Sequence, residues 1–334
     1  MSVNYLETGS TDPCYNLAFE EYVLKNRTEG DWLILWQNAN TVVVGLNQNT
    51  AEEINPEFVA AHNVTVVRRE TGGGAVYHDL GNLNYSFITD LGDAASLTIA
   101  RFTLPVCRAL EAMGVHAQTS GRNDITVDGQ KVSGVAQRIY KDRILHHGTL
   151  LFDSDPAMVA GALNADPAKF VSKSAKSVRA RIGNIRQALP KDMTLEEFWT
   201  KLLSELSSDG LERRALAGEE TEKIKALAEE KYRSWDWTYG HSPAYGYKNK
   251  ARFPGGTLQT ELSVKNGAIQ TARFSGDFMA VTSCEPAVRA LEGVKYRRED
   301  VEKVLSGLDI RAMFGGITTD EILKVMFGEC EDVC

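Results

Sequence analysis

The residues of this chain that are best suited to chemistry lie in two short glycine-containing segments. The first, residues 68–82 (RRETGGGAVYHDLGN), places two arginines shortly before three consecutive glycines. The second, residues 123–134 (NDITVDGQKVSG), places Asp124 and Lys131 on either side of an Asp-Gly pair. Backbone amides beside glycines and fixed cationic side chains bind anionic oxygen atoms. The two segments therefore indicate a site for a phosphate or carboxylate group.

The glycine triplet does not match either of the common nucleotide-binding motifs. A Gly-x-Gly-x-x-Gly fingerprint would need glycine at position 77, where Tyr77 stands, and no Gly-Lys-Ser/Thr sequence occurs. However, residues 63–69 (NVTVVRR) predict a strand that leads directly into the glycines. Backbone N–H groups can then approach a ligand closely, and Arg68 and Arg69 at the strand end can pair with its charge.

The second segment predicts a β-hairpin with a defined register. Asp128-Gly129 is the favoured two-residue hairpin turn. It places Thr126 opposite Lys131 and Asp124 opposite Ser133, so that these four side chains share one face. Asp124 and Lys131 become diagonal neighbours, and the turn alone brings a carboxylate and an ammonium group together. Lys131 also has small neighbours, which leave room for a ligand.

Other reactive residue types do not form a convincing site. His78-Asp79 and His146-His147 are adjacent pairs, whose side chains point in opposite directions on an extended chain, so neither predicts a metal site. The five cysteines form no Cys-x-x-Cys pair, and their odd number indicates reduced thiols. The sequence shows neither a targeting signal nor an apolar run of membrane-spanning length. We therefore expect a cytoplasmic protein.

Length and charge restrict the classes of protein. A chain of 334 residues predicts one large and one small domain. A net charge of −8 argues against general affinity for nucleic acid or anionic membranes. Residues 169–191 are a local exception, with seven basic and no acidic side chains. This segment is either a solvated surface or a local anion field facing nucleotide phosphates or an acidic protein partner.

Local patterns predict the elements that position these residues. Asp12-Pro13 begins a helix that continues through residue 26, and residues 97–114 form a helix that ends at Gly114. The apolar runs 32–36 and 41–45 predict two paired strands, and residues 123–152 a β-meander. Helices are expected within 193–232, and Asn266-Gly267 turns a hairpin in the last part of the chain. The predicted domains are 1–246 and 247–334.

Taken together, these segments resemble the lipoate–protein ligase A family. Further matching segments are YNLAFEEY, HHGTLL, SVRARIGN and SWDWTYGHSPAY, and the order and spacing of the motifs agree over essentially the whole chain. The resemblance implies an α/β (α+β) fold. Its large catalytic domain has a mixed β-sheet packed with helices, as in biotin ligases and class II synthetases, and a small α+β accessory domain follows at the C-terminus.

The resemblance also implies an activity in lipoate salvage. Lipoate and MgATP would give lipoyl-AMP and pyrophosphate, and the lipoyl group would then move to a lysine. The implied acceptors are lipoyl domains of 2-oxoacid dehydrogenase E2 subunits and the glycine-cleavage H protein. The expected protein is a monomer without nucleic-acid or membrane partners. Residues 32–36 and 41–45 are candidates for an apolar slot that holds the acyl chain.

The residues that match the family's motifs are expected to form the site. Lys131 is the implied catalytic residue, contacting both carboxyl and phosphate oxygens, and Asp124 is the implied Mg²⁺ ligand. The residues implied to bind ATP or lipoyl-AMP are Arg69, Gly74, Ala75, Val76, Tyr77, Asn123, Asp124, Lys131 and His147.

Three alternative activities remain open from the sequence. An ATP-independent octanoyl or lipoyl transferase of the same fold is disfavoured by the C-terminal domain and by the lack of a well-placed cysteine. A biotin ligase is disfavoured because its Gly-Arg-Gly-Arg-x-Gly loop is absent. The third class is a non-catalytic carrier of lipoyl-AMP or an amidotransferase. The carrier would show no ATP–pyrophosphate exchange, and the amidotransferase would work without ATP.

Overall fold

Two units, each assembled from several stretches of the chain, make up the structure. The computed structural model describes residues 3–92, 99–121, 123–163, 170–172, 182–207 and 210–329. The first unit comprises Met1–Leu46, Thr65–Ala160 and Ser177–Ser234, and the second comprises Asn47–Val64, Gly161–Lys176 and Trp235–Cys334. The boundary predicted between residues 246 and 247 lies inside strand β13 (Tyr245–Phe253), and the division into 1–246 and 247–334 stays a prediction.

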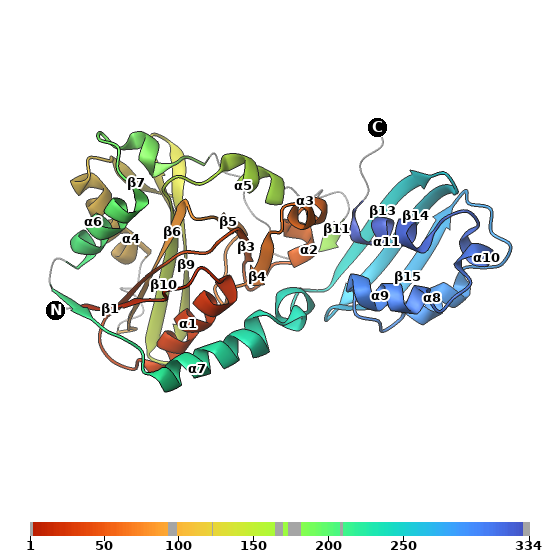
Figure 1. Ribbon diagram of the computed structural model, residues 1–334, viewed down its shortest axis with the longest axis horizontal. Helices are drawn as coiled ribbons and strands as arrows, with labels where there is room; N and C mark the ends of the chain where they lie inside the picture. Colours follow the sequence, from red (N-terminus) through yellow and green to blue (C-terminus); the bar gives the residue numbers. More distant parts are fainter. Residues whose placement is uncertain are drawn as a thin grey trace. The chain divides into compact units, whose positions relative to one another are not determined.

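An eight-stranded mixed sheet forms the centre of the first unit (Figure 1). β1 runs parallel to both of its neighbours, whereas the other pairs are antiparallel. The strands, in order across the sheet, are β12 (Leu211–Arg213), β1 (Val3–Glu7), β2 (Trp32–Trp36), β6 (Asn82–Asp90), β10 (Arg143–Leu151), β9 (Gln130–Tyr140), β8 (Asp124–Val127) and β7 (Ala117–Ser120).

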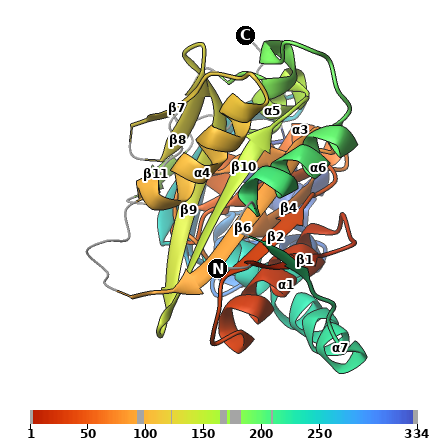
Figure 2. The same cartoon turned by 90° about the vertical axis from the view of Figure 1, so that its left-hand side faces the viewer.

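One face of this sheet carries the apolar core. Helices α4 (Ile99–Ala112) and α6 (Leu195–Leu206) lie across it, as Figure 2 shows. Their buried side chains pack against alternate residues of β2, β6, β10 and β8, including Leu33, Tyr85 and Ile125. Burial of this apolar surface stabilises the unit, and it leaves the opposite face of the same strands for polar residues.

The opposite face of the sheet is covered by α1 (Pro13–Asn26) and by a second, three-stranded sheet. In that sheet β3 (Thr41–Val44) pairs with β4 (Thr65–Arg68) and β5 (Val76–His78). The predicted pairing of 32–36 with 41–45 is therefore wrong, although both are strands. All four β3 residues and most of β2 are buried, so each strand is an interior strand of its own sheet.

Local signals located most of the predicted elements correctly. Asp12 accepts a hydrogen bond from the Cys14 amide at 3.0 Å and begins α1, as predicted. Helix α4 ends before Gly114, which has a φ of 83°; residues 97 and 98 lie outside the described residues. Within the region predicted as helical, the short strand β12, which the sequence did not reveal, separates α6 from α7 (Gly218–Leu227), and a π-helix, η4 (Ala228–Tyr232), follows α7 directly.

The second unit has a four-stranded antiparallel sheet with its own apolar core. Its strands, in order, are β11 (Phe170–Ser172), β13, β14 (Gly256–Lys265) and β15 (Ala268–Gly276). The turn between β14 and β15 at Asn266-Gly267 is confirmed, with positive φ angles at both residues. The helices of this unit are α2 (Thr50–Glu53), α3 (Pro56–Ala61), η5 (Asp236–Gly240), α8 (Glu285–Leu291), α9 (Arg298–Leu305), α10 (Ile310–Phe314) and α11 (Thr319–Phe327).

Two further helical segments complete the chain, namely α5 (Pro156–Ala162) and the 3-10 helix η3 (Ile185–Ala188). The architecture is the mixed α/β fold that was predicted, with a large mixed sheet and a second sheet-containing unit. In the part of the chain that the structure describes, no helix combines the length and apolar character needed to cross a lipid bilayer.

Because two histidines are buried, we expect the free energy of unfolding to fall as the pH is lowered. Burial lowers the pKa of His78 and of His146 to about 3 in each case. Below pH 6.5 the unfolded chain binds protons that the folded chain does not, so stability falls as the pH falls toward 3. We expect the free energy of unfolding to drop by about 2 kcal/mol for each histidine between pH 7 and pH 5. Urea denaturation at the two pH values measures this change.

The exposed residue His116 provides the control for this prediction. His146→Gln should remove about half of the pH-dependent loss, whereas His116→Gln, whose side chain is 84% exposed, should leave it unchanged. An equal pH dependence in wild type and His146→Gln would contradict the assignment.

Candidate active site

The β8–β9 hairpin has the predicted turn but a shifted register. Asp128 and Gly129 have φ angles of 49° and 73°, and Thr126 lies opposite Lys131, as predicted. A β-bulge between Ile125 and Thr126 then places Ile125 opposite Ser133 and Asp124 opposite Gly134. The prediction that Ser133 faces Asp124 is therefore wrong. Ser133 is fully buried instead of sharing a face with the ion pair, because a bulge reverses the alternation of side chains beyond it.

The bulge still brings Asp124 and Lys131 together, and it adds a glycine beneath them. Lys131 Nζ lies 2.7 Å from Asp124 Oδ1, and about a quarter of each side chain is exposed. A Cβ atom at Gly134 would lie 3.1 Å from the same Nζ atom. The Lys131 carbonyl also accepts a hydrogen bond from the Gly183 amide at 3.0 Å. The ammonium group is thus held above a residue with no side chain, and the Lys131 side chain is partly exposed to solvent.

Substitution of this glycine should impair the site without unfolding the protein. In Gly134→Ala the new methyl group would push Lys131 Nζ aside by a few tenths of an ångström. Alanine at a strand position restricts the unfolded chain, so stability should be unchanged or higher by up to about 1 kcal/mol. The resemblance implies lipoate-dependent ATP–pyrophosphate exchange, and we expect the rate of this exchange to fall roughly tenfold in Gly134→Ala if Lys131 contacts the reactants, because small displacements at a reacting site lose rate steeply.

The matched control is Gly218→Ala, since a Cβ atom there would meet nothing within 4 Å. It should leave the exchange rate unaltered. An unchanged exchange rate in Gly134→Ala would show that the close contact between Gly134 and the Lys131 ammonium group does not affect the reaction.

Asn123, just before β8, and Asp124, the first residue of β8, offer side-chain oxygen atoms. Asn123 donates its side-chain amide to the Val135 carbonyl at 3.1 Å, and its own carbonyl accepts from the Val135 amide at 2.9 Å. These bonds fix Asn123 against β9. Asp124 supplies a carboxylate, the ligand type that Mg²⁺ prefers when phosphate oxygens and waters complete its coordination. The residue types therefore fit a magnesium ion that arrives with a nucleotide.

Arg69 lies beneath the loop formed by residues 70–75, here called the glycine loop. Its guanidinium group donates to the carbonyl oxygens of Val43 at 3.0 Å, Gly72 at 2.6 Å and Gly74 at 2.8 Å. Its Nε donates to Thr71 Oγ1 at 2.9 Å. Burial lowers the pKa of Arg69 to about 10, still far above neutrality. Arg69 therefore holds the loop from inside, and its contact with a nucleotide stays a prediction.

The glycine loop also needs glycine at position 45, immediately after β3. A Cβ atom at Gly45 would lie 2.2 Å from the Gly73 carbonyl oxygen, and Gly73 itself has a φ of 90°. Arg68 is fully buried and donates to the Gly45 and Leu46 carbonyls at 2.8 and 3.0 Å. Its side chain therefore points toward backbone carbonyls. The close approach of Gly45 to Gly73 and the hydrogen bonds of Arg68 therefore hold the glycine loop against the end of β3.

The remaining predicted residues of this segment line the end of the loop. Gly74, Ala75 and Val76 are half-buried. Tyr77 is buried and donates its hydroxyl to Asn40 Oδ1 at 2.9 Å, and burial raises its pKa to about 12. Tyr77 thus fixes β5, while the residues just before it remain accessible. Binding of the nucleotide by the 74–77 backbone stays a prediction.

His147 links the glycine loop to helix α1 through a buried hydrogen-bond network. Its Nδ1 lies 2.9 and 3.0 Å from the two Glu20 carboxylate oxygens, and its Nε2 lies 2.8 Å from Thr71 Oγ1. Thr71 Oγ1 also accepts from Arg69 Nε, so this hydroxyl joins Arg69 to the His147 ring. Ser86 also donates to Glu20, at 2.5 Å. The network therefore fixes both the His147 ring and the loop.

The Lys131–Asp124 pair and the His147 network lie on one face of the sheet. On β9, Gly134 pairs with Asp124 and Ala136 pairs with His147. Residues two apart on a strand share a face and are separated by about 7 Å. This is the face opposite the α4–α6 core. The structure therefore gathers these predicted site residues on the face of the sheet that lies opposite the α4–α6 core.

Two other predicted features have different outcomes. His78 Nδ1 lies 3.1 Å from Asn38 Nδ2, whereas Asp79 accepts hydrogen bonds from the Gly81 and Asp155 amides, so the two adjacent side chains have separate partners. In the basic segment, the exposed Arg186 pairs with Asp153 at 2.7 Å and with Asp192 at 2.8 Å. Its charge is thus compensated. Lys169, Lys173, Lys176, Arg179 and Arg181 lie outside the described residues.

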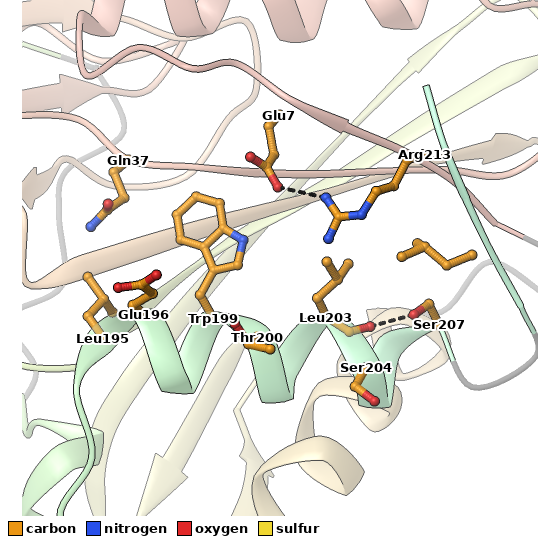
Figure 3. Close-up of a pocket in the computed structure, with 11 residues that line it drawn as sticks. Glu7, Gln37, Leu195, Glu196, Trp199, Thr200, Leu203, Ser204, Ser207 and Arg213 are labelled. Atoms are coloured by element: carbon orange, nitrogen blue, oxygen red, sulfur yellow. Dashed lines mark hydrogen bonds and ion pairs between the residues drawn. The ribbon is translucent and has the colours of Figure 1, made fainter. Parts of the chain in front are cut away.

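A separate surface hollow lies beside α6, and Figure 3 shows its lining. Its volume is about 860 Å³, and its walls include Trp199 of α6, Glu7 of β1 and Arg213 of β12. Glu7 and Arg213 pair with each other at 3.3 Å. Among its lining residues in the described part of the chain, none belongs to the predicted site. In tests of ligand binding, this hollow is the alternative location with which the predicted site can be compared.

The sequence analysis did not identify the residues that contact and position the predicted site residues and the glycine loop, notably Glu20, Glu70 and Thr71. The available signal was the adjacent acidic residues Glu20 and Glu21 in an otherwise largely apolar helical segment, and the structure shows that both are buried. Buried carboxylates need partners. The pair therefore pointed to hydrogen-bonded contacts, although not to their identity.

Comparisons with known proteins found two family models that match this chain. Residues 12–207 match the model of the lipoyl protein ligase A/B catalytic domain, and residues 242–326 match that of the bacterial lipoate protein ligase C-terminus. Lipoate–protein ligase 1 of Staphylococcus aureus (strain Mu50 / ATCC 700699) is 42% identical over 318 residues, which cover 95% of this chain and 97% of the relative.

Solved structures share the fold. P. falciparum LipL1 in complex with lipoate aligns with a TM-score of 0.61 and 24% identity, covering 98% of this chain and 99% of its own. A lipoate-protein ligase A bound with ATP aligns with a TM-score of 0.61 and 23% identity, covering 72% of this chain and 98% of its own.

Proposed function

Because this chain belongs to the lipoate–protein ligase family, we propose that its Lys131–Asp124 pair and glycine loop form the site where lipoate reacts with ATP. In the first step the lipoate carboxylate attacks the α-phosphorus, the bond to the bridging oxygen breaks, and pyrophosphate leaves. In the second step a lysine amine of the acceptor attacks the acyl carbonyl, loses a proton and releases AMP. The acyl group ends in an amide bond.

The observation that carries the proposal is the partly exposed ammonium group of Lys131 above Gly134. A carboxylate and a phosphate repel each other, and the transition state concentrates further negative charge on oxygen. A fixed ammonium group that contacts both reactants aligns them and stabilises this charge. Such a group contributes about 3–4 kcal/mol to transition-state stabilisation, by comparison with oxyanion-hole donors.

The other residues act by positioning. The half-buried backbone at 74–76 gives the nucleotide access to amide groups, while Arg69 and Tyr77 hold the two ends of this stretch. Asp124, with Asn123 beside it, would hold Mg²⁺, which when bound supplies charge neutralisation at the phosphates. His147 stays fixed between Glu20 and Thr71 and keeps the loop in place on the acyl side of the site.

The partner that fits this reaction is a lipoyl domain, and the finer proposal is a domain of a 2-oxoacid dehydrogenase E2 subunit or the glycine-cleavage H protein. Both present a lysine on a protein surface that can enter an open site. Family membership supports a ligase over an ATP-independent transferase or an amidotransferase. A monomer acting in the cytoplasm completes the proposal.

A single assay separates these possibilities. Purified protein, lipoate, MgATP and an apo lipoyl domain are combined, and the mass of the lipoyl domain is measured. We expect the mass increase of one lipoyl group, formation of AMP, and no modification when ATP is omitted. Equal modification without ATP would support the transferase class and contradict the proposal.

A further inference from the structure

Glu70, the first residue of the glycine loop, lies at the centre of a second charged network. Arg138 of β9 contacts it twice: Nη1 donates to the Glu70 carbonyl at 2.7 Å, and Nε lies 3.0 Å from Glu70 Oε2. Lys231 forms an ion pair with the Glu70 carboxylate. The Glu70 backbone and side chain are thus held by two cations, one from β9 and one from the π-helix η4.

The network continues from Lys231 to helix α1. Lys231 Nζ also lies 2.8 Å from Glu21 Oε2, and the Tyr232 hydroxyl donates to the same oxygen at 2.6 Å. Lys25 pairs with the other Glu21 oxygen. Burial alone would raise the pKa of Glu21, but hydrogen bonds from Lys231, Lys25 and Tyr232 bring it below its ordinary value. Glu21 therefore remains a carboxylate that requires its cations.

Lys231 is the cation of this network whose loss we expect to have the largest effect, because it lies between two largely buried carboxylates. The side chains of Glu21 and Glu70 are 4% and 11% exposed, and Lys231, at 20%, lies between them. Two largely buried carboxylates repel each other unless a cation separates them. Arg138 and Lys25 are the more exposed outer partners, at 28% and 34%. Loss of the Lys231 charge would leave Glu70 held by Arg138 alone and repelled by Glu21, which would loosen the start of the glycine loop.

The backbone at Lys231 adds a second observation. Residues Ala228–Tyr232 form a π-helix, a rare conformation that is frequent at functional sites. From this segment the consecutive residues Lys231 and Tyr232 both contact the same Glu21 oxygen. The segment therefore presents two donors to α1 and one cation to the loop.

We propose that Arg138 and Lys231 clamp Glu70, and that Lys231 is a positioning residue for nucleotide binding by the glycine loop. The proposal rests on the adenylation site proposed above. Lys231 acts through Glu70 and touches no reacting atom. Arg69 fixes the loop from beneath, and the clamp fixes its first residue from the side. Glu70, Arg138 and Lys231 are thereby assigned a role in the activity of the site.

Hydrogen–deuterium exchange of the wild type and of Lys231→Met tests the clamp without relying on activity. We expect amide exchange across residues 70–76 to become at least tenfold faster in Lys231→Met, while exchange in the α4–α6 core is unchanged. Glu21 keeps Lys25 and Tyr232, so the protein should remain folded. Glu70→Gln is the second variant and should show the same faster loop exchange.

Kinetics then distinguish a positioning role from a structural one. In Lys231→Met, KM for ATP should rise about tenfold, whereas Lys231→Arg should restore it to within about threefold of wild type. The double variant Glu70→Gln/Lys231→Met should be no worse than either single variant. The control is Lys223→Met on α7, which breaks an exposed i,i+4 ion pair with Glu219 and should change nothing.

Two results would overturn the proposal that Lys231 clamps Glu70. Unchanged loop exchange in Lys231→Met, or losses in the two single variants that multiply in the double variant, would overturn the clamp. If the wild type showed no ATP–pyrophosphate exchange at all, the proposed adenylation function would fail. The deuterium data would still show independently whether Lys231 holds the loop.

Discussion

Lys131→Ala should abolish lipoate-dependent ATP–pyrophosphate exchange while leaving the protein folded. The ammonium group is partly exposed and pairs with an equally exposed carboxylate, so its loss should change the free energy of unfolding by less than about 1 kcal/mol. The exchange rate should fall by two to three decades or more, because the developing oxyanion loses its fixed cation. Isotopic pyrophosphate exchange and urea denaturation measure the two effects.

Lys248→Ala provides the matched control for Lys131. Lys248 is also a strand lysine and pairs with Glu261 on the neighbouring strand at 2.9 Å. Its substitution should remove a comparable ion pair and leave the exchange rate as in wild type. Near-normal exchange in a folded Lys131→Ala protein would refute the assignment of Lys131.

Arg69→Met should damage both the fold and the activity. The substitution leaves the carbonyl oxygens of Val43, Gly72 and Gly74 without the donors that Arg69 supplies. A buried polar group without a partner costs about 1–3 kcal/mol, so we expect a loss of about 3–5 kcal/mol in the free energy of unfolding. The collapsed loop should also lower the exchange rate at least a hundredfold.

Arg69→Lys and Arg289→Met complete this test. Lysine keeps the charge but cannot reproduce the planar fork of donors, so Arg69→Lys should fold with an intermediate loss of both stability and activity. Arg289 is 75% exposed, and its substitution should change stability by less than about 0.5 kcal/mol. An Arg69→Met protein as stable as wild type would show that the loop does not depend on this side chain.

Local signals predicted the parts of the fold that short-range chemistry determines. The Asp128-Gly129 and Asn266-Gly267 turns adopt the positive φ angles that two-residue hairpins need, and Asp12 caps α1. Strands β2 and β3 were located, but their partners were not, because two buried strands carry the same apolar pattern in either sheet. Pairing over long sequence separations depends on the whole fold.

In the candidate site, too, the sequence predicted local contacts but not contacts between distant residues. The sequence predicted that Lys131 meets Asp124, and the two are in contact, although a bulge that no residue pattern announced changes the partner of Asp124 from Ser133 to Gly134. The orientation of Arg69 could not be predicted either, since a basic residue before glycines is compatible with binding either a ligand or backbone carbonyls. Contacts such as Glu20 with His147 join residues 127 positions apart.

The most direct test of the central claim is a co-crystal structure with a non-hydrolysable sulfamoyl analogue of lipoyl-AMP. The adenylate should lie against the 74–77 backbone, and Lys131 Nζ should lie within hydrogen-bond distance of the oxygens at the acyl–sulfamoyl junction. The acyl chain should extend along the sheet face that carries His147. Binding of the analogue elsewhere, for example in the hollow lined by Trp199, or with Lys131 still paired only to Asp124, would contradict the account.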